Sequence, residues 1–189
     1  MSLAQTSPQP SRMTIDAFVD WASNQASGRY ELVDGEIVTM PAEGGRHNLA
    51  KLEIAIALRA AVKAAGLVCT VFTDGMTVRI DAYHGREPDA AVTLGKVADL
   101  SAKILADPVV VVEVISPGTE VIDTTVKLLE YFSVPSIRHY LIVSPEPKAI
   151  IHHQRAGDGT VTTRIVHGGD LRLDPPGLVL AVDPILAVL

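Results

Sequence analysis

The sequence predicts an α/β fold in which helices flank a mixed β-sheet. Apolar residues recur at three- and four-residue spacing over "RHNLAKLEIAIALRAAVKAAG", which predicts a long helix that closes at Gly66. The continuous β-branched run "ADPVVVVEVIS" predicts a central strand buried on both faces. A second helical pattern follows this run, and such a mixture of helices and strands is typical of an α/β domain.

Shorter elements precede the central strand. A helix is expected over residues 14–23, with Thr14 as its N-cap. "RYELVDGEIVTM" predicts two strands joined at an Asp-Gly pair, which favours a tight hairpin. After the long helix, "LVCTVFTDGMTVRI" predicts two further strands, and "EPDAAVTL" predicts another short one.

The second half of the chain continues the alternation. A helix is expected over residues 119–132, and Pro135 ends it. "RHYLIVSP" predicts another buried strand, and "KAIIHHQRAGDGTVTTRIV" predicts a hairpin that turns at Asp158-Gly159. The tail "GLVLAVDPILAVL" is expected to pack a strand or short helix on the body of the domain.

Length and composition limit the function classes. A chain of 189 residues is expected to form one domain over residues 13–189, after a flexible leader over residues 1–12. The net charge of −6 argues against an extended basic surface, so nonspecific nucleic-acid binding should be weak unless positive charge is local. The single Cys69 excludes an internal disulfide and a multi-cysteine metal site. No apolar run reaches the roughly 18–20 residues that span a bilayer, so we expect a cytoplasmic protein without a membrane partner.

Glu113 stands inside one of the most apolar runs of the chain. Strand alternation places it on one face with Val111 and Ile115. An isolated buried carboxylate is very costly, so Glu113 must be paired with a cation, protonated, or bound to a metal ion shared with Asp89 of "PDAAV". Two carboxylates on neighbouring strands suit Mg²⁺, which prefers oxygen ligands.

A metal ion held in this way would suit phosphodiester hydrolysis. The ion neutralises developing charge and activates water, and a nearby lysine can orient that water. The residues alone are weak evidence, because Pro88-Asp89 is also a common way to begin a strand. The position two residues after Glu113 holds Ile115 and not a lysine.

Several motifs in order make the pattern specific. They are "RYELVDGEIVTM", His47, "PDAAV", "VVEVISPGT", then Asp123, Lys127 and Tyr131, and "HYLIVSPE". Over about residues 13–155 the chain resembles the Uma-two family of restriction-endonuclease-like proteins in the PD-(D/E)xK nuclease superfamily. The resemblance implies a restriction-endonuclease-like core, Asp89 and Glu113 as metal ligands, and Lys127 as a catalytic lysine moved onto the following helix. It also implies that Glu31 and His47 lie near the site.

Helical periodicity leaves the role of Lys127 open. The apolar arc of this helix consists of Val121, Ile122, Val126, Leu128, Leu129 and Phe132. Lys127 falls nearly opposite that arc, and it shares its face with Asp123 and Tyr131, as a solvated Asp–Lys pair would. By pattern, Lys127 is a solvated surface residue; by resemblance, it is catalytic.

Four other polar positions allow either two interpretations or a structural one alone. His47 either contacts phosphate or caps the long helix, and Glu31 is either an exposed strand carboxylate or a site residue. His152 and His153 are neighbours in a strand and point to opposite faces, so we expect structural roles for both.

The predicted function is a Mg²⁺-dependent endonuclease that hydrolyses phosphodiester bonds of nucleic acid, DNA first, with Mn²⁺ as the alternative ion. Asp89, Glu113 and the Val114 carbonyl are the expected metal ligands, Lys127 and Glu31 the expected catalytic residues, and His47 the expected nucleic-acid contact. The alternative is an inactive module with the same fold that binds nucleic acid or a protein partner. A homodimer whose assembly is its main role is a third hypothesis.

Overall fold

The computed structural model describes residues 12–115 and 122–189, with side chains from residue 124 in the second range. Its helices are α1 (Ile15–Ser23), α2 (Gly45–Ala65), α3 (Ile122–Ser133) and α4 (Asp183–Ala187). Its strands are β1 (Tyr30–Val33), β2 (Glu36–Thr39), β3 (Cys69–Thr73), β4 (Val78–Arg79), β5 (Gly85–Arg86), β6 (Ala90–Leu94), β7 (Pro108–Val114), β8 (His139–Pro145), β9 (Lys148–Arg155), β10 (Val161–Val166), β11 (Asp170–Leu173) and β12 (Leu178–Ala181). The structure confirms the α/β class and the mixed sheet.

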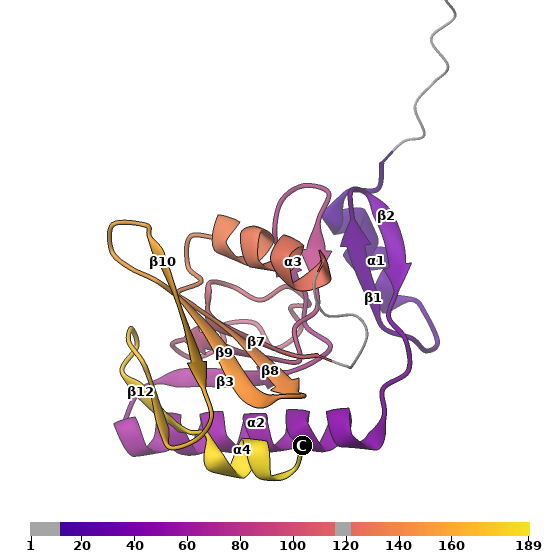
Figure 1. Ribbon diagram of the computed structural model, residues 1–189. Helices are drawn as coiled ribbons and strands as arrows, with labels where there is room; N and C mark the ends of the chain where they lie inside the picture. Colours follow the sequence, from indigo (N-terminus) through magenta and orange to yellow (C-terminus); the bar gives the residue numbers. More distant parts are fainter. Residues whose placement is uncertain (1–11, 116–121) are drawn as a thin grey trace, which may run out of the picture.

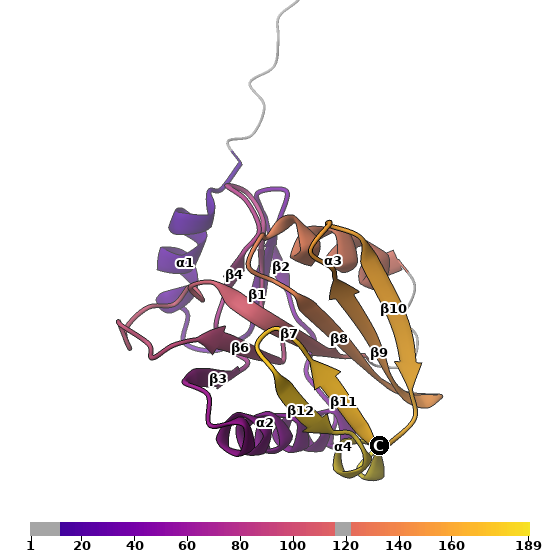
Figure 2. The same cartoon turned by 90° about the vertical axis from the view of Figure 1, so that its left-hand side faces the viewer.

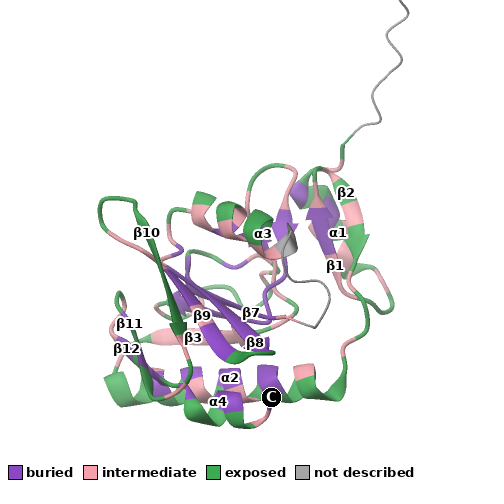
Figure 3. Cartoon of the chain, viewed as in Figure 1, coloured by how far each residue is buried: buried purple, intermediate pink, exposed green. Residues whose placement is uncertain are grey.

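A six-stranded sheet forms the centre of the molecule. Its strand order is β10-β9-β8-β7-β6-β3, with β7 and β8 parallel and their other neighbours antiparallel. Figure 1 shows α2 and α4 below this sheet and α3 above it. Every residue of β7 and β8 is buried, as Figure 3 shows. The prediction of a central strand buried on both faces is therefore confirmed.

The alternation of β7 separates two hydrophobic cores. Val112 and Val114 pack with α2 and the β11–β12 hairpin in one core, while Val111 and Ile115 belong to the core that contains Tyr131 of α3. Glu113 lies between Val112 and Val114 in the chain, so the pleat turns it toward the side of Tyr131. The face expected for Glu113 is confirmed.

A second sheet lies beside the first, with the order β2-β1-β5-β4 (Figure 2). Ile15 and Phe18 of α1 pack on Leu32 of β1 in a small core of their own. The chain passes from β5 in this sheet to β6 in the larger sheet through Glu87, Pro88 and Asp89. The acidic residues Glu87 and Asp89 therefore lie where the two sheets meet.

The predicted turn at Asp34-Gly35 and the predicted end of the long helix at Gly66 are both confirmed. Asp34 and Gly35 both have positive φ, 53° and 78°, as the tight hairpin between β1 and β2 requires. Gly66 ends α2 in the left-handed conformation with φ 65°. The chain around Asp74 connects β3 and β4, which belong to different sheets. Within the described ranges, no helix is both long and apolar enough to cross a membrane.

The predicted apolar arc of α3 is wrong for two of its four described members, Val126 and Leu129, while Leu128 and Phe132 do pack on the core. Leu129 is 71% exposed and Val126 is exposed, whereas Lys127 and Tyr131 are buried at 6% and 0% exposure. The helix places its polar face toward the sheet because carboxylates of β1 and β7 partner that face. Counting apolar residues cannot reveal partners that come from other strands. The arc members Val121 and Ile122 and the side chain of Asp123 lie outside what is described.

Two adjacent leucines of α3 test this orientation. Leu128 packs against the core of Tyr131, while Leu129 points outward. Leu129→Ala should change the free energy of unfolding by less than about 0.5 kcal/mol. Leu128→Ala should lower it by roughly 1–3 kcal/mol through lost packing. Urea unfolding of the two variants measures both, and a larger loss for Leu129→Ala would contradict the orientation.

Candidate active site

Asp89 and Glu113 approach each other at the edge of two paired strands. Ala90 of β6 pairs with Val112 of β7, so one further step in this antiparallel register brings Asp89 beside Glu113. The Val114 amide donates a hydrogen bond of 2.7 Å to Asp89 Oδ2, which fixes that carboxylate. The two acidic residues are 2% and 6% exposed. Together with Val114 they line one pocket of about 180 Å³.

Lys127 reaches this pocket from α3. Its Nζ lies 3.2 Å from Glu113 Oε1 and 3.3 Å from Glu31 Oε1. The Tyr131 hydroxyl donates a 2.6 Å hydrogen bond to Glu113 Oε1. Burial above all, and then the negative charge of Glu113, raise the pKa of Tyr131 well above its usual range, so this hydroxyl keeps its proton. The interpretation of Lys127 as a solvated surface residue is wrong.

Glu31 of β1 is also buried, so its interpretation as an exposed strand carboxylate is wrong. Arg86 Nη1 donates to Glu31 Oε2 at 2.8 Å, and the Glu87 amide donates to Oε1 at 3.2 Å. Arg86 also binds Glu130 of α3, at 2.6 Å through Nε. Burial tends to lower the pKa of Arg86, but these carboxylates outweigh it and raise the pKa above its usual range. Arg86 therefore stays charged and, from β5, connects β1 with α3.

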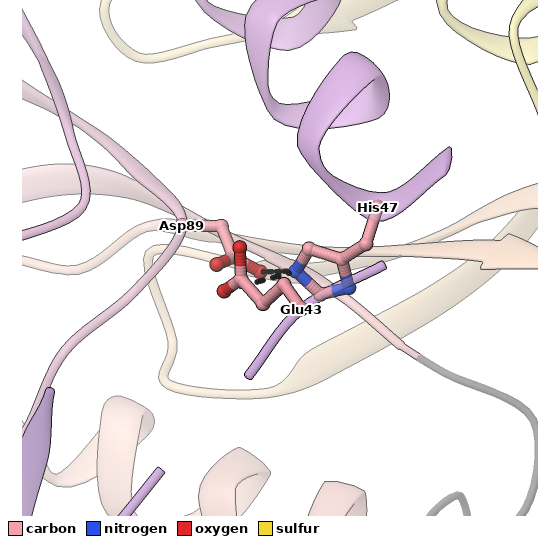
Figure 4. A group of neighbouring side chains, drawn as sticks. All are labelled: Glu43, His47 and Asp89. Carbon is pink, nitrogen blue, oxygen red and sulfur yellow. Dashed lines mark ion pairs between the residues drawn. The ribbon is translucent and has the colours of Figure 1, made fainter. Parts of the chain in front are cut away.

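A second group of side chains lies on the other side of Asp89. Figure 4 shows Glu43, His47 and Asp89 pointing toward one another. His47 Nε2 lies 3.3 Å from Asp89 Oδ2 and 3.5 Å from Glu43 Oε1. The nearest ligand atoms of the three residues all lie within 4.8 Å of one another, as a common metal ion would require. Glu43 was not predicted from the sequence, although its spacing of four residues from His47 was a usable signal.

Two cations complete the second group and were also missed. Arg29 binds Glu87 at 2.6 Å through Nε and places Nη2 3.6 Å from Asp89 Oδ1. Lys51 of α2 binds Asp74 at 2.7 Å. Both cations also pair with Glu43. These contacts join the start of α2 to the residues between β5 and β6.

The ion pairs leave an excess of negative charge. Among the described residues, the connected carboxylates are Glu31, Glu43, Asp74, Glu87, Asp89, Glu113 and Glu130. Their cationic partners are Arg29, Lys51, Arg86 and Lys127. Leaving His47 aside, seven carboxylates face four lysine and arginine side chains. An added divalent cation would offset most of the difference, so the donor set fits one.

The two central carboxyl groups have opposite pKa shifts. Burial raises the pKa of Glu113 to about 7, and the charges of Asp89 and Glu31 act in the same direction against the opposing effect of Lys127. Burial also acts to raise the pKa of Asp89, but hydrogen bonds from His47 and the Val114 amide bring it below its usual value. Asp89 is therefore an anion at neutral pH, while Glu113 can exchange a proton there.

A pH series on Glu113→Gln tests the shift at Glu113. The folded-state pKa of about 7 exceeds the ordinary value of 4.5, so the folded protein binds more protons between these values. The stabilisation is full below pH 4.5 and is lost as the pH rises through 7. Without added metal, wild type should lose up to about 3 kcal/mol of unfolding free energy relative to Glu113→Gln over this window. Parallel pH dependences in the two proteins would contradict the shift.

Comparison with known proteins places this site in a family. The chain matches the Uma2 (Uma-two) model, described as a putative restriction endonuclease, over residues 15–186. An uncharacterized protein of Synechocystis sp., slr1290, is 27% identical over 176 residues, which cover 92% of this chain and 91% of the relative.

A solved structure supports the fold. It is described as a putative nuclease belonging to DUF820 from Anabaena variabilis, and it superimposes with a TM-score of 0.73. The match covers 93% of this chain and 98% of that chain. At 16% sequence identity it shows similarity of the fold alone. Because the family model covers almost the whole described chain, the protein belongs to the Uma2 family of putative restriction endonucleases.

Proposed function

We propose that the protein is a metal-dependent nuclease that hydrolyses phosphodiester bonds of nucleic acid, with DNA as the first expected substrate and Mg²⁺ as the expected ion. One observation carries the proposal. Asp89, Glu113 and Lys127 come from three separate segments and line one pocket, with the lysine ammonium directly on the Glu113 carboxylate. Phosphodiester hydrolysis needs a lysine held beside an acidic pair. A Lys127 side chain in solvent would not be held there.

Asp89 and Glu113 are the residues that would hold the ion, with the Val114 carbonyl as a further expected ligand. The Val114 amide already fixes the orientation of Asp89, and Tyr131 fixes that of Glu113. When bound, a divalent ion supplies charge neutralisation at the phosphate and a lower pKa for a water. Mg²⁺ suits these ligands because it prefers carboxylate oxygens and keeps several waters.

Lys127 supplies the positive charge that the protein itself brings to the reaction. Glu113 and Glu31 hold its ammonium at 3.2 and 3.3 Å, so its position is set before substrate arrives. An ammonium in this place can donate a hydrogen bond to a water or to a phosphate oxygen at the metal ligands. Glu31 acts as a positioning residue in this scheme, because it holds Lys127 and is itself held by Arg86.

The surroundings of the pocket indicate where the substrate would lie. A neighbouring pocket shares His47, Val114 and Ile115 with the first and adds Arg46 at the start of α2. We place the nucleic-acid strand across these two pockets, with Arg46 and the first turn of α2 toward its phosphates. Arg46 and the start of α2 supply positive charge there, and a bound divalent ion would add to it, as a chain with a net charge of −6 requires.

Cleavage assays with Mg²⁺ or Mn²⁺ on single- and double-stranded DNA and RNA test the proposal. Lys127→Met should reduce the cleavage rate at least about 100-fold, because the positioned cation is lost. Lys148→Met is the matched control, since Lys148 is exposed on β9, and it should cleave like wild type.

The loss of Lys127 leaves two buried carboxylates less compensated, which can cost roughly 3–5 kcal/mol of stability. Circular dichroism must therefore show that Lys127→Met is folded at the assay temperature. Glu113→Gln provides a second inactive variant at a smaller cost, because Lys127 keeps Glu31 as its partner and a charge leaves an acidic cluster. If wild type cuts none of these substrates with either ion, the fold serves as an inactive module that binds nucleic acid or a protein partner.

A further inference from the structure

We propose that Glu43, His47 and Asp89 form a metal site of their own, which selects a first-row transition-metal ion such as Mn²⁺ over Mg²⁺. This site shares Asp89 with the Asp89–Glu113 pair. The inference rests on the proposed function only because Asp89 is a ligand in both. It replaces the expectation that His47 is a nucleic-acid contact.

The separations of the donor atoms suit a common ion. His47 Nε2 lies 3.3 Å from Asp89 Oδ2 and 3.5 Å from Glu43 Oε1. Two ligands that bind one ion at about 2.1–2.2 Å with an angle of about 90–110° lie roughly 3.0–3.6 Å apart. The two separations from His47 therefore fall in the range that a shared ion sets, and all three ligand atoms lie within 4.8 Å of one another.

Two parts of the backbone hold the three ligands. Glu43 precedes α2 and His47 lies in its first turn, four residues later, so both side chains point to the same place (Figure 4). Asp89 is fixed by the Val114 amide at the end of β7. The side chains are 18%, 13% and 3% exposed, so the group is sheltered, yet all three residues line the pocket through which an ion can enter.

The imidazole decides the selectivity. Mg²⁺ favours all-oxygen ligand sets, whereas Mn²⁺ and later first-row ions accept a neutral imidazole nitrogen together with carboxylates. One nitrogen and two carboxylate groups therefore favour a transition-metal ion. The pair of Asp89 and Glu113 offers oxygen alone and carries no such preference.

Arg29 and Lys51 do not prevent ion binding. Both contact Glu43 in the metal-free protein, but each has another carboxylate close by. Arg29 keeps Glu87 at 2.6 Å, and Lys51 keeps Asp74 at 2.7 Å. Glu43 can turn toward an ion while both cations retain a partner.

Electron paramagnetic resonance of free Mn²⁺, which reports bound ion by loss of signal, tests this site without substrate. Wild type should bind Mn²⁺ and keep it against a roughly tenfold excess of Mg²⁺, because the imidazole ligand favours Mn²⁺. His47→Ala should weaken Mn²⁺ binding at least about tenfold and let Mg²⁺ displace it. His84→Ala is the control, because His84 pairs with Asp81 in a loop outside the pocket.

Glu113→Gln separates this inference from the proposed function. It should abolish cleavage yet retain Mn²⁺ that resists Mg²⁺, because Glu113 is not one of the three ligands. Glu43→Gln gives a second ligand variant if His47→Ala is not folded. Equal Mn²⁺ binding by His47→Ala and His84→Ala, or loss of Mn²⁺ in Glu113→Gln alone, would overturn the site. Mn²⁺ retention without any nuclease activity would overturn the proposed function and leave this site standing.

Discussion

The buried ammonium of Lys127, held between Glu113 and Glu31, is the interaction on which the arrangement of this protein depends. It joins α3 to β7 of the large sheet and to β1 of the small sheet. It also answers why a carboxylate can stand in the apolar run of β7. Glu113 is partnered there by an ammonium and by the Tyr131 hydroxyl, which reduces the cost of burying its charge.

The remaining contacts follow from this pair. Arg86 binds Glu31 on one side and Glu130 of α3 on the other, so the helix cannot turn Val126 and Leu129 inward without breaking buried ion pairs. Breaking a buried pair by removing one partner is strongly destabilising. The exposure of Leu129 is the consequence, because the face of α3 that carries Lys127 and Tyr131 is the one that contacts the sheet. Structure and proposed chemistry thus use the same charges.

The sequence predicted most of the fold because local patterns determine it. The apolar spacing of α2, the β-branched run of β7 and the Asp-Gly turn at residues 34–35 each act within a few neighbouring residues. The sequence could not predict that β3 and β4 belong to different sheets. Strand pairing depends on contacts between segments far apart in the chain.

The site was predictable only in part, for the same reason. Asp89 and Glu113 stood out as acids at the ends of apolar strands, but periodicity placed Lys127 in solvent and only the family resemblance opposed this. Glu43 offered only its spacing of four residues from His47, and Lys51 gave no signal of its own, since the importance of both comes from where α2 begins relative to Asp89. Charge networks are tertiary features, and single-element patterns do not contain them.

Calorimetric titration of Mg²⁺ into wild type and Glu113→Gln tests the central claim most directly, namely that the Asp89–Glu113 pair is the ion site of a nuclease. The account predicts a binding heat for wild type at neutral pH, weaker binding as the pH falls below about 7 because a proton competes for Glu113, and no Mg²⁺ heat for a folded Glu113→Gln variant. Equal Mg²⁺ affinity in the two proteins would contradict it.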